Sequence, residues 1–115
     1  MEEKVLVRRF RMFAYSVYHL VKKIKFNPDD RILISQLVDA AFSSAANYRA
    51  SQRAKSTRDF VNKIKIVLEE IDEANFWLTC MDDLKISQDI ALAKTIKESD
   101  DLTAITVSIL KKIND

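Results

Sequence analysis

The chain of 115 residues contains no glycine, and its only proline is Pro28. Tight β-hairpins depend on glycine, because their turns need backbone angles that other residues avoid. With 48% apolar and 31% charged residues, the composition suits amphipathic helices instead, and we expect an all-α fold. The length predicts one domain over residues 1–115, because a chain of this size can bury an adequate core.

Four segments carry apolar residues at every third or fourth position, which is the period of an amphipathic helix. The expected helices span residues 5–26, 28–53, 57–84 and 88–113. Connections as short as these favour antiparallel neighbours, so the pattern predicts an antiparallel up-down-up-down four-helix bundle.

Polar residues at the segment boundaries support these limits. Asn27 can cap the second helix, and Pro28 is favoured at a first helical position. Ser56 and Asp59 resemble a capping box that opens the third helix, and Ser87 can cap the fourth. The core stripe of the third helix consists of Phe60, Ile64, Val67, Ile71, Ala74, Leu78 and Met81. The clearest stripe, on the fourth helix, consists of Leu102, Ile105, Ile109 and Ile113, although the first half of that helix is weaker.

A second line on the third helix lies away from this core stripe. Its members are Ile66, Glu70, Glu73, Trp77, Cys80 and Leu84. A tryptophan flanked by aliphatic residues suits a partner-binding surface, because aromatic anchors dominate interface energetics. We therefore predict a homo-oligomer contact at Ile66, Glu70, Glu73, Trp77 and Leu84. The alternative is that the first or fourth helix of the same chain covers this line.

Basic residues gather where the second helix meets the third. The cluster consists of Arg49, Arg53, Lys55 and Arg58. Such a cluster can bind RNA or DNA through phosphates, and a ring of subunits would repeat it. The alternative is a solvated surface with intrahelical pairs such as Asp59 with Lys63, since the net charge is only +2. We expect no cluster of exposed aromatic residues, and therefore binding to phosphate or shape rather than to bases.

The sequence argues against an enzyme and predicts no cofactor or metal. The single histidine, His19, lacks the Glu-x-x-His pairing of di-metal bundles, and Cys80 has no evident base beside it. We expect Cys80 to be a core thiol, and a lone cysteine suits a reducing compartment. Without an apolar signal segment or a membrane-spanning run, the expected location is the cytoplasm.

Several segments together resemble the four-helix-bundle proteins first noticed in intervening sequences of bacterial 23S ribosomal RNA genes. The matching segments are Ser-Ser-Ala-Ala-Asn at 43–47, Lys-Ser-Thr-Arg-Asp-Phe at 55–60, Glu69, Asp-Glu at 72–73 and Trp-Leu at 77–78. The resemblance implies a bundle that assembles as a ring, often a pentamer. It also implies kinship with the accessory variability determinant of diversity-generating retroelements, which binds nucleic acid and a reverse transcriptase.

The chain departs from that family soon after the Ala-Asn step. Where relatives often carry a glutamate, this sequence has Tyr-Arg-Ala-Ser at residues 48–51, so a role of that glutamate does not transfer. Two hypotheses follow. The first is a non-enzymatic oligomeric bundle that binds RNA or DNA, and the second is a structural or protein-interaction module without nucleic-acid binding.

Overall fold

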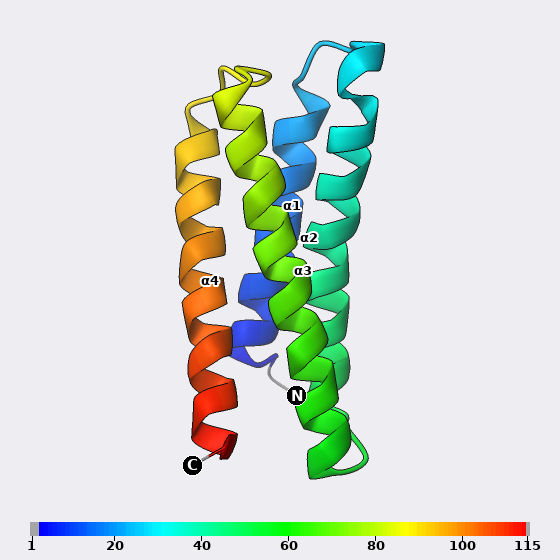
Figure 1. Ribbon diagram of the computed structural model, residues 1–115, viewed down its shortest axis with the longest axis vertical. Coiled ribbons are helices and arrows are strands. Elements are labelled where there is room, and N and C mark those ends of the chain that lie inside the picture. The colour runs from blue at the N-terminus through cyan, green and yellow to red at the C-terminus, as the bar shows by residue number, and fades with distance from the viewer. Residues whose placement is uncertain (1–2, 115) are drawn as a thin grey trace.

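The computed structural model describes residues 3–114, whose regular elements are all helical (Figure 1). They are α1 (Val5–Lys22), the short 3-10 turn η1 (Pro28–Asp30), α2 (Arg31–Ser51), α3 (Thr57–Asp83) and α4 (Ala91–Asn114). Successive helices run in opposite directions, and the start of α1 and the end of α4 lie towards the same end of the bundle as the α2–α3 connection (Figure 1). Each helix packs against two neighbours, with α1 against α4 closing the bundle. The predicted fold is confirmed.

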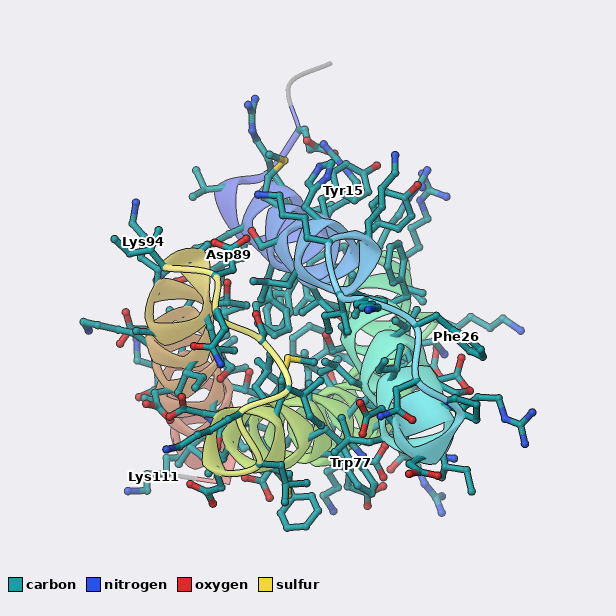
Figure 2. All side chains as sticks on the ribbon, turned by 90° about the horizontal axis from the view of Figure 1, so that it is seen from above. Tyr15, Phe26, Trp77, Asp89, Lys94 and Lys111 are labelled. Atoms are coloured by element: carbon teal, nitrogen blue, oxygen red, sulfur yellow. The ribbon has the colours of Figure 1, made fainter. Side chains whose placement is uncertain are left out.

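All four helices contribute to one core, into which their inner side chains project (Figure 2). On α3 the predicted stripe is buried from Ile64 to Met81, while Phe60 is half-buried. Phe10 of α1 stacks on Tyr48 of α2 with ring centroids 4.8 Å apart. Burial of each large side chain of this kind stabilises the fold by about 1.5–3 kcal/mol.

Helix α4 reaches the core partly through hydroxyl side chains. Thr95, Ser99 and Thr106 are buried, although a pattern of apolar residues does not include them. Each hydroxyl donates to a carbonyl of the preceding turn, as Thr106 does to Leu102 at 2.7 Å. Because the hydroxyls are satisfied within their own helix, their burial leaves no unpaired polar group.

Helix α1 is shorter than predicted and stops at Lys22 instead of residue 26. The residue before a proline is pushed out of the helical region by steric clash, and Asn27 is accordingly extended at φ −142° and ψ 120°. The Asn27 side chain accepts the Asp29 N–H at 3.0 Å, as predicted for a cap. The second predicted helix divides here into η1 and α2.

Helix α3 begins and ends close to the predicted positions. Ser56 Oγ accepts the Asp59 N–H at 3.1 Å, while Asp59 Oδ2 accepts the Lys55 N–H, so the cap reaches one residue further back than a standard capping box. At the other end Lys85 adopts a positive φ of 56°. The Ile86 N–H then bonds to Met81 O at 3.0 Å, which is the Schellman pattern usually built on glycine.

Helix α4 starts at Ala91 and not at residue 88. The predicted cap, Ser87, instead accepts the Asp89 N–H, and Asp89 Oδ1 accepts the Ala91 N–H at 2.9 Å. Asp89 also pairs with Lys23 Nζ at 3.1 Å, which joins the end of α1 to the start of α4. The Ala91 N–H, and then Lys23, lower the pKa of the Asp89 carboxyl.

Candidate functional site

The four predicted phosphate-binding residues lie together at one end of the bundle, which we call the basic end: Arg49, Arg53, Lys55 and Arg58. Arg49 stands in the last turn of α2 and Arg58 in the first turn of α3, with the other two in the connection. All four are exposed. Among residues 3–113 none of them forms an ion pair, so their charges face solvent.

The fold brings further cations to the same end. Lys4 precedes α1, and its ammonium donates to Gln52 Oε1 at 2.9 Å, which places the start of α1 beside the end of α2. Lys111 and Lys112 occupy the last turn of α4, whose end Figure 1 shows at the same pole. The positive charge at this pole therefore comes from all four helices.

Charge is distributed unevenly along the chain from the last turn of α2 to the end of α3. Residues 49–68 contain six Lys or Arg and one acidic residue, whereas residues 69–83 contain six Asp or Glu and no Lys or Arg. The small net charge of +2 therefore conceals a polarised molecule. The α2–α3 connection therefore attracts a phosphate backbone more strongly than the net charge alone suggests.

The described acidic residues near the basic end are already engaged. Asp59 pairs with Lys63 at 2.7 Å, which confirms the predicted intrahelical pair. The hydrogen bond from Lys63, followed by the Lys55 N–H, lowers the pKa of the Asp59 carboxyl. Glu3 forms an ion pair with Arg11, and the hydrogen bond from Arg11 lowers the pKa of Glu3.

The second line of α3 is partly covered by the chain itself. Ile66 and Leu84 are 40% and 65% exposed, and Glu73 is exposed. Glu70, Trp77 and Cys80 are half-buried, so Cys80 is not the core thiol that we expected.

The cover over Trp77 comes from a helix that the sequence reading did not name. Trp77 packs against the core and lies between α3 and α2 in Figure 2. The alternative to a subunit contact, in which the first or fourth helix covers this line, therefore names the wrong helix for Trp77, which lies towards α2.

Two polar groups on this line lack a favourable partner within the described chain. The Trp77 Nε1–H is buried and has no hydrogen-bond partner among the described residues. Burial raises the pKa of the Glu70 carboxyl, and repulsion from Glu73, Glu69 and Asp39 raises it further. Because Asp39 belongs to α2, acidic groups of α2 and α3 lie near enough to repel each other. Phe76 beside Trp77 is 56% exposed.

No catalytic or metal-binding arrangement emerges from residues 3–114. Within this range no three His, Cys, Asp or Glu side chains lie close enough to hold a metal ion. His19 is exposed on α1 with its ring against Tyr18. The described helices also include none that is long and apolar enough to cross a bilayer.

The sequence reading missed one surface feature. Tyr15, Tyr18 and Phe42 are 41%, 47% and 38% exposed and lie together between α1 and α2, where they form what we call the aromatic groove with Ala45, Ala46 and Arg49. The expectation of no exposed aromatic cluster is therefore wrong. The three-residue spacing of the two tyrosines is visible in the sequence, but Phe42 joins them only through the pairing of α1 with α2.

These features define a class of protein, namely an antiparallel four-helix bundle with a basic end and no metal cluster in its described part. The family model described as 23S rRNA-intervening sequence protein matches residues 2–108. The chain therefore belongs to this family, as the resemblance of its motifs implied.

One solved structure supports the fold independently. It is a protein of unknown function from the S23 ribosomal protein family of Bacteroides thetaiotaomicron, with a TM-score of 0.84 and 24% identity. The match covers 93% of this chain and 99% of that chain. At this identity the similarity bears on the fold alone. A comparison with curated proteins gave no match.

Proposed function

We propose that this protein is a non-enzymatic, homo-oligomeric bundle, formed by residues 1–115 as one domain, that binds RNA or DNA phosphates at its basic end. The observation that carries the proposal is the group of four exposed cations at the α2–α3 connection, none of them ion-paired within residues 3–113. Cations that face solvent release the counterions of a nucleic acid on binding, which is the main source of affinity for phosphate.

Homo-oligomer formation would strengthen this binding. Each added subunit repeats the basic end, and linked weak contacts bind far more tightly than single ones. A pentameric ring is the assembly that the family resemblance favours. The same resemblance supports kinship with the nucleic-acid-binding accessory protein of diversity-generating retroelements, and a lone cysteine fits a cytoplasmic location.

We assign the subunit contact to Ile66, Glu70, Glu73, Trp77 and Leu84 on α3. The exposure of Ile66 and Leu84 supports the assignment, because apolar side chains of this size gain free energy when a partner covers them. The Trp77 ring also supports it, since it is only half-buried and aromatic anchors dominate interface energetics. Native mass spectrometry at low salt reports subunit count and retained nucleic acid together.

The decisive experiment reverses the four charges and measures binding to labelled RNA and DNA over a range of salt concentrations. The variant is Arg49→Glu, Arg53→Glu, Lys55→Glu and Arg58→Glu combined. We expect affinity to fall by about 100-fold or more, and the slope of log K against log salt to shrink by about three, since each single-strand phosphate contact adds about 0.7.

A control with the same change in net charge is available away from the basic end. Lys25, Arg31, Lys85 and Lys94 are exposed cations, and their combined reversal to glutamate should have a much smaller effect on affinity. Equal losses in both variants would mean that only net charge matters. Unchanged affinity in the basic-end variant would refute the proposed site, and the absence of binding in the wild type would favour the structural or protein-interaction module.

A further inference from the structure

The aromatic groove is continuous with the basic end. Two adjoining hollows of about 200 and 320 Å³ share Tyr15 and Phe42, so they form a single groove along α1 and α2. Arg49, a member of the basic end, lines one end of it. At the other end the Lys22 ammonium lies 5.6 Å from the centroid of the Tyr18 ring. A cation therefore stands at each end of an aromatic surface.

Acidic residues are absent from this groove. None of the residues that line the two hollows is Asp or Glu, and Arg11 adds a further cation. The helical sequences beneath it explain the bias, because neither residues 5–26 nor residues 40–58 contain an acidic side chain. Glu3 is the described carboxylate nearest the groove's Arg11, and it is bound to that guanidinium. The surface complements the charge of a phosphate backbone.

The aromatic rings are placed for stacking. The Tyr15 and Phe42 centroids are 6.3 Å apart with planes inclined by 44°, so they do not stack on one another face to face. Small side chains at Ala45 and Ala46 keep the floor of the groove open. Between Val7 and Tyr18 the helix rises about 17 Å, which is the length of about five nucleotides of a stacked strand.

We propose that the aromatic groove binds unpaired bases, so that this protein prefers single-stranded over double-stranded nucleic acid. The inference rests on the proposed function, in which the basic end holds the phosphates of the same strand. Bases in a duplex are stacked and paired and cannot reach the rings, whereas unpaired bases stack on aromatic faces without regard to sequence. Tyr15, Tyr18 and Phe42 supply the stacking surface, and Arg49 and Lys22 hold the flanking phosphates.

The test compares labelled oligo(U), oligo(dT) and a mixed-sequence duplex of matched length by fluorescence anisotropy. Tyr15→Ala and Tyr18→Ala should each weaken single-strand binding by roughly 5- to 100-fold, the range measured for loss of one stacked base. Duplex binding should not change. Tyr15→Phe and Tyr18→Phe keep the rings and should retain affinity, and Phe26→Ala removes a 75% exposed ring elsewhere as a control.

Ala46→Leu provides a second approach that keeps every ring. Leucine is a strong helix former, and at this exposed position it fills the groove without disturbing the core, so single-strand binding should fall while helicity stays constant. Ultraviolet crosslinking of oligo(U) followed by mass spectrometry should place adducts at Tyr15, Tyr18 or Phe42. A preference for oligo(U) over oligo(dT), or the reverse, identifies the natural strand, and either result agrees with the inference.

Two results would overturn the inference. Equal affinity for single strand and duplex, unaffected by the tyrosine variants, would reject it while leaving the basic end and the proposed function intact. A change in subunit count on Tyr18→Ala or Ala46→Leu, seen by native mass spectrometry, would make the groove a contact between copies of this chain. Loss of binding only in the basic-end variant also separates the two proposals.

Discussion

Helix α2 is flanked by two surfaces of opposite chemical character. On the α1 side lie Tyr15, Phe42 and Arg49, and no acidic residue lines the groove. On the α3 side Asp39 lies near Glu70, and the repulsion between them contributes to the raised pKa of Glu70. A single helix thus separates a surface that attracts phosphate from one that repels it.

The difference indicates which kind of partner each side of α2 can accept. Nucleic acid approaching the α3 side would bring its phosphates towards several carboxylates, which costs free energy at short range. Protein side chains carry no such uniform charge, and exposed Leu84 and Ile66 offer them apolar contact on the same helix. We therefore assign nucleic acid to the α1 side and subunit contact to the α3 side, and both assignments can be tested separately.

The largest expected effect on stability is that of Trp77→Ala. Complete removal of a buried Trp side chain lowers the free energy of unfolding by about 3–5 kcal/mol. For this half-buried ring we expect the free energy of unfolding, measured in urea, to fall by about 2 kcal/mol. If the side chain also holds subunits together, native mass spectrometry should show a smaller assembly before helicity is lost. Destabilisation with an unchanged subunit count would instead place Trp77 entirely in the monomer core.

Two matched variants sharpen the role of Trp77. Trp77→Phe retains an aromatic ring but removes the N–H that lacks a partner among the described residues. If an adjacent subunit binds this N–H, the phenylalanine variant should assemble less tightly. If nothing binds it, the variant should be as stable as the wild type. Phe76→Ala changes a neighbouring ring that is 56% exposed and controls for the loss of aromatic surface.

An intermediate effect is expected from adding one negative charge to either side of α2. Ala46→Glu places it in the aromatic groove, and Gln36→Glu places it at an exposed position one turn from Asp39. Two charges 4 Å apart in water interact by about 1 kcal/mol, so Ala46→Glu should weaken nucleic-acid binding about fivefold. Gln36→Glu should change it little. Equal effects would contradict the assignment of nucleic acid to the α1 side of α2.

The smallest effect is expected from Glu70→Gln. Because the pKa of Glu70 is raised in the folded protein, its charged form destabilises the fold, and protonation relieves that penalty. Glu70→Gln should therefore raise the melting temperature at neutral pH. The advantage should vanish as the pH falls below the ordinary range of a glutamate. If Glu70→Gln still raises the melting temperature in acid, the loss of the charge is not the cause.

Periodicity predicted the helices well where apolar residues alone form the inner face. Six of the seven expected core residues of α3, from Ile64 to Met81, are buried. The same reasoning was less accurate for α4, where of the expected stripe only Leu102 is buried, while Thr95, Ser99 and Thr106 face inwards with their hydroxyls bonded to their own helix. Local hydrogen bonding therefore made polar residues behave as core, which an apolar count cannot detect.

The candidate sites also differ in how far the sequence could predict them. The basic end was predictable because its four residues are close in the sequence and sit at a helix boundary. The cover over Trp77 was assigned to the wrong helix, and the aromatic groove was missed. Both depend on which face of α2 meets which neighbour, and a helical wheel describes only one helix at a time.

The sequence by itself determined the number of helices, their approximate ends, the basic connection and the family to which the chain belongs. Apolar period, capping residues and local charge are sufficient for these, since each acts within a few turns of one helix. The tertiary structure alone decided that Tyr15 meets Phe42, that Asp39 lies near Glu70, and that α2 half-buries Trp77. Those contacts depend on how helices rotate and pack against each other, because burial is a property of the assembled core.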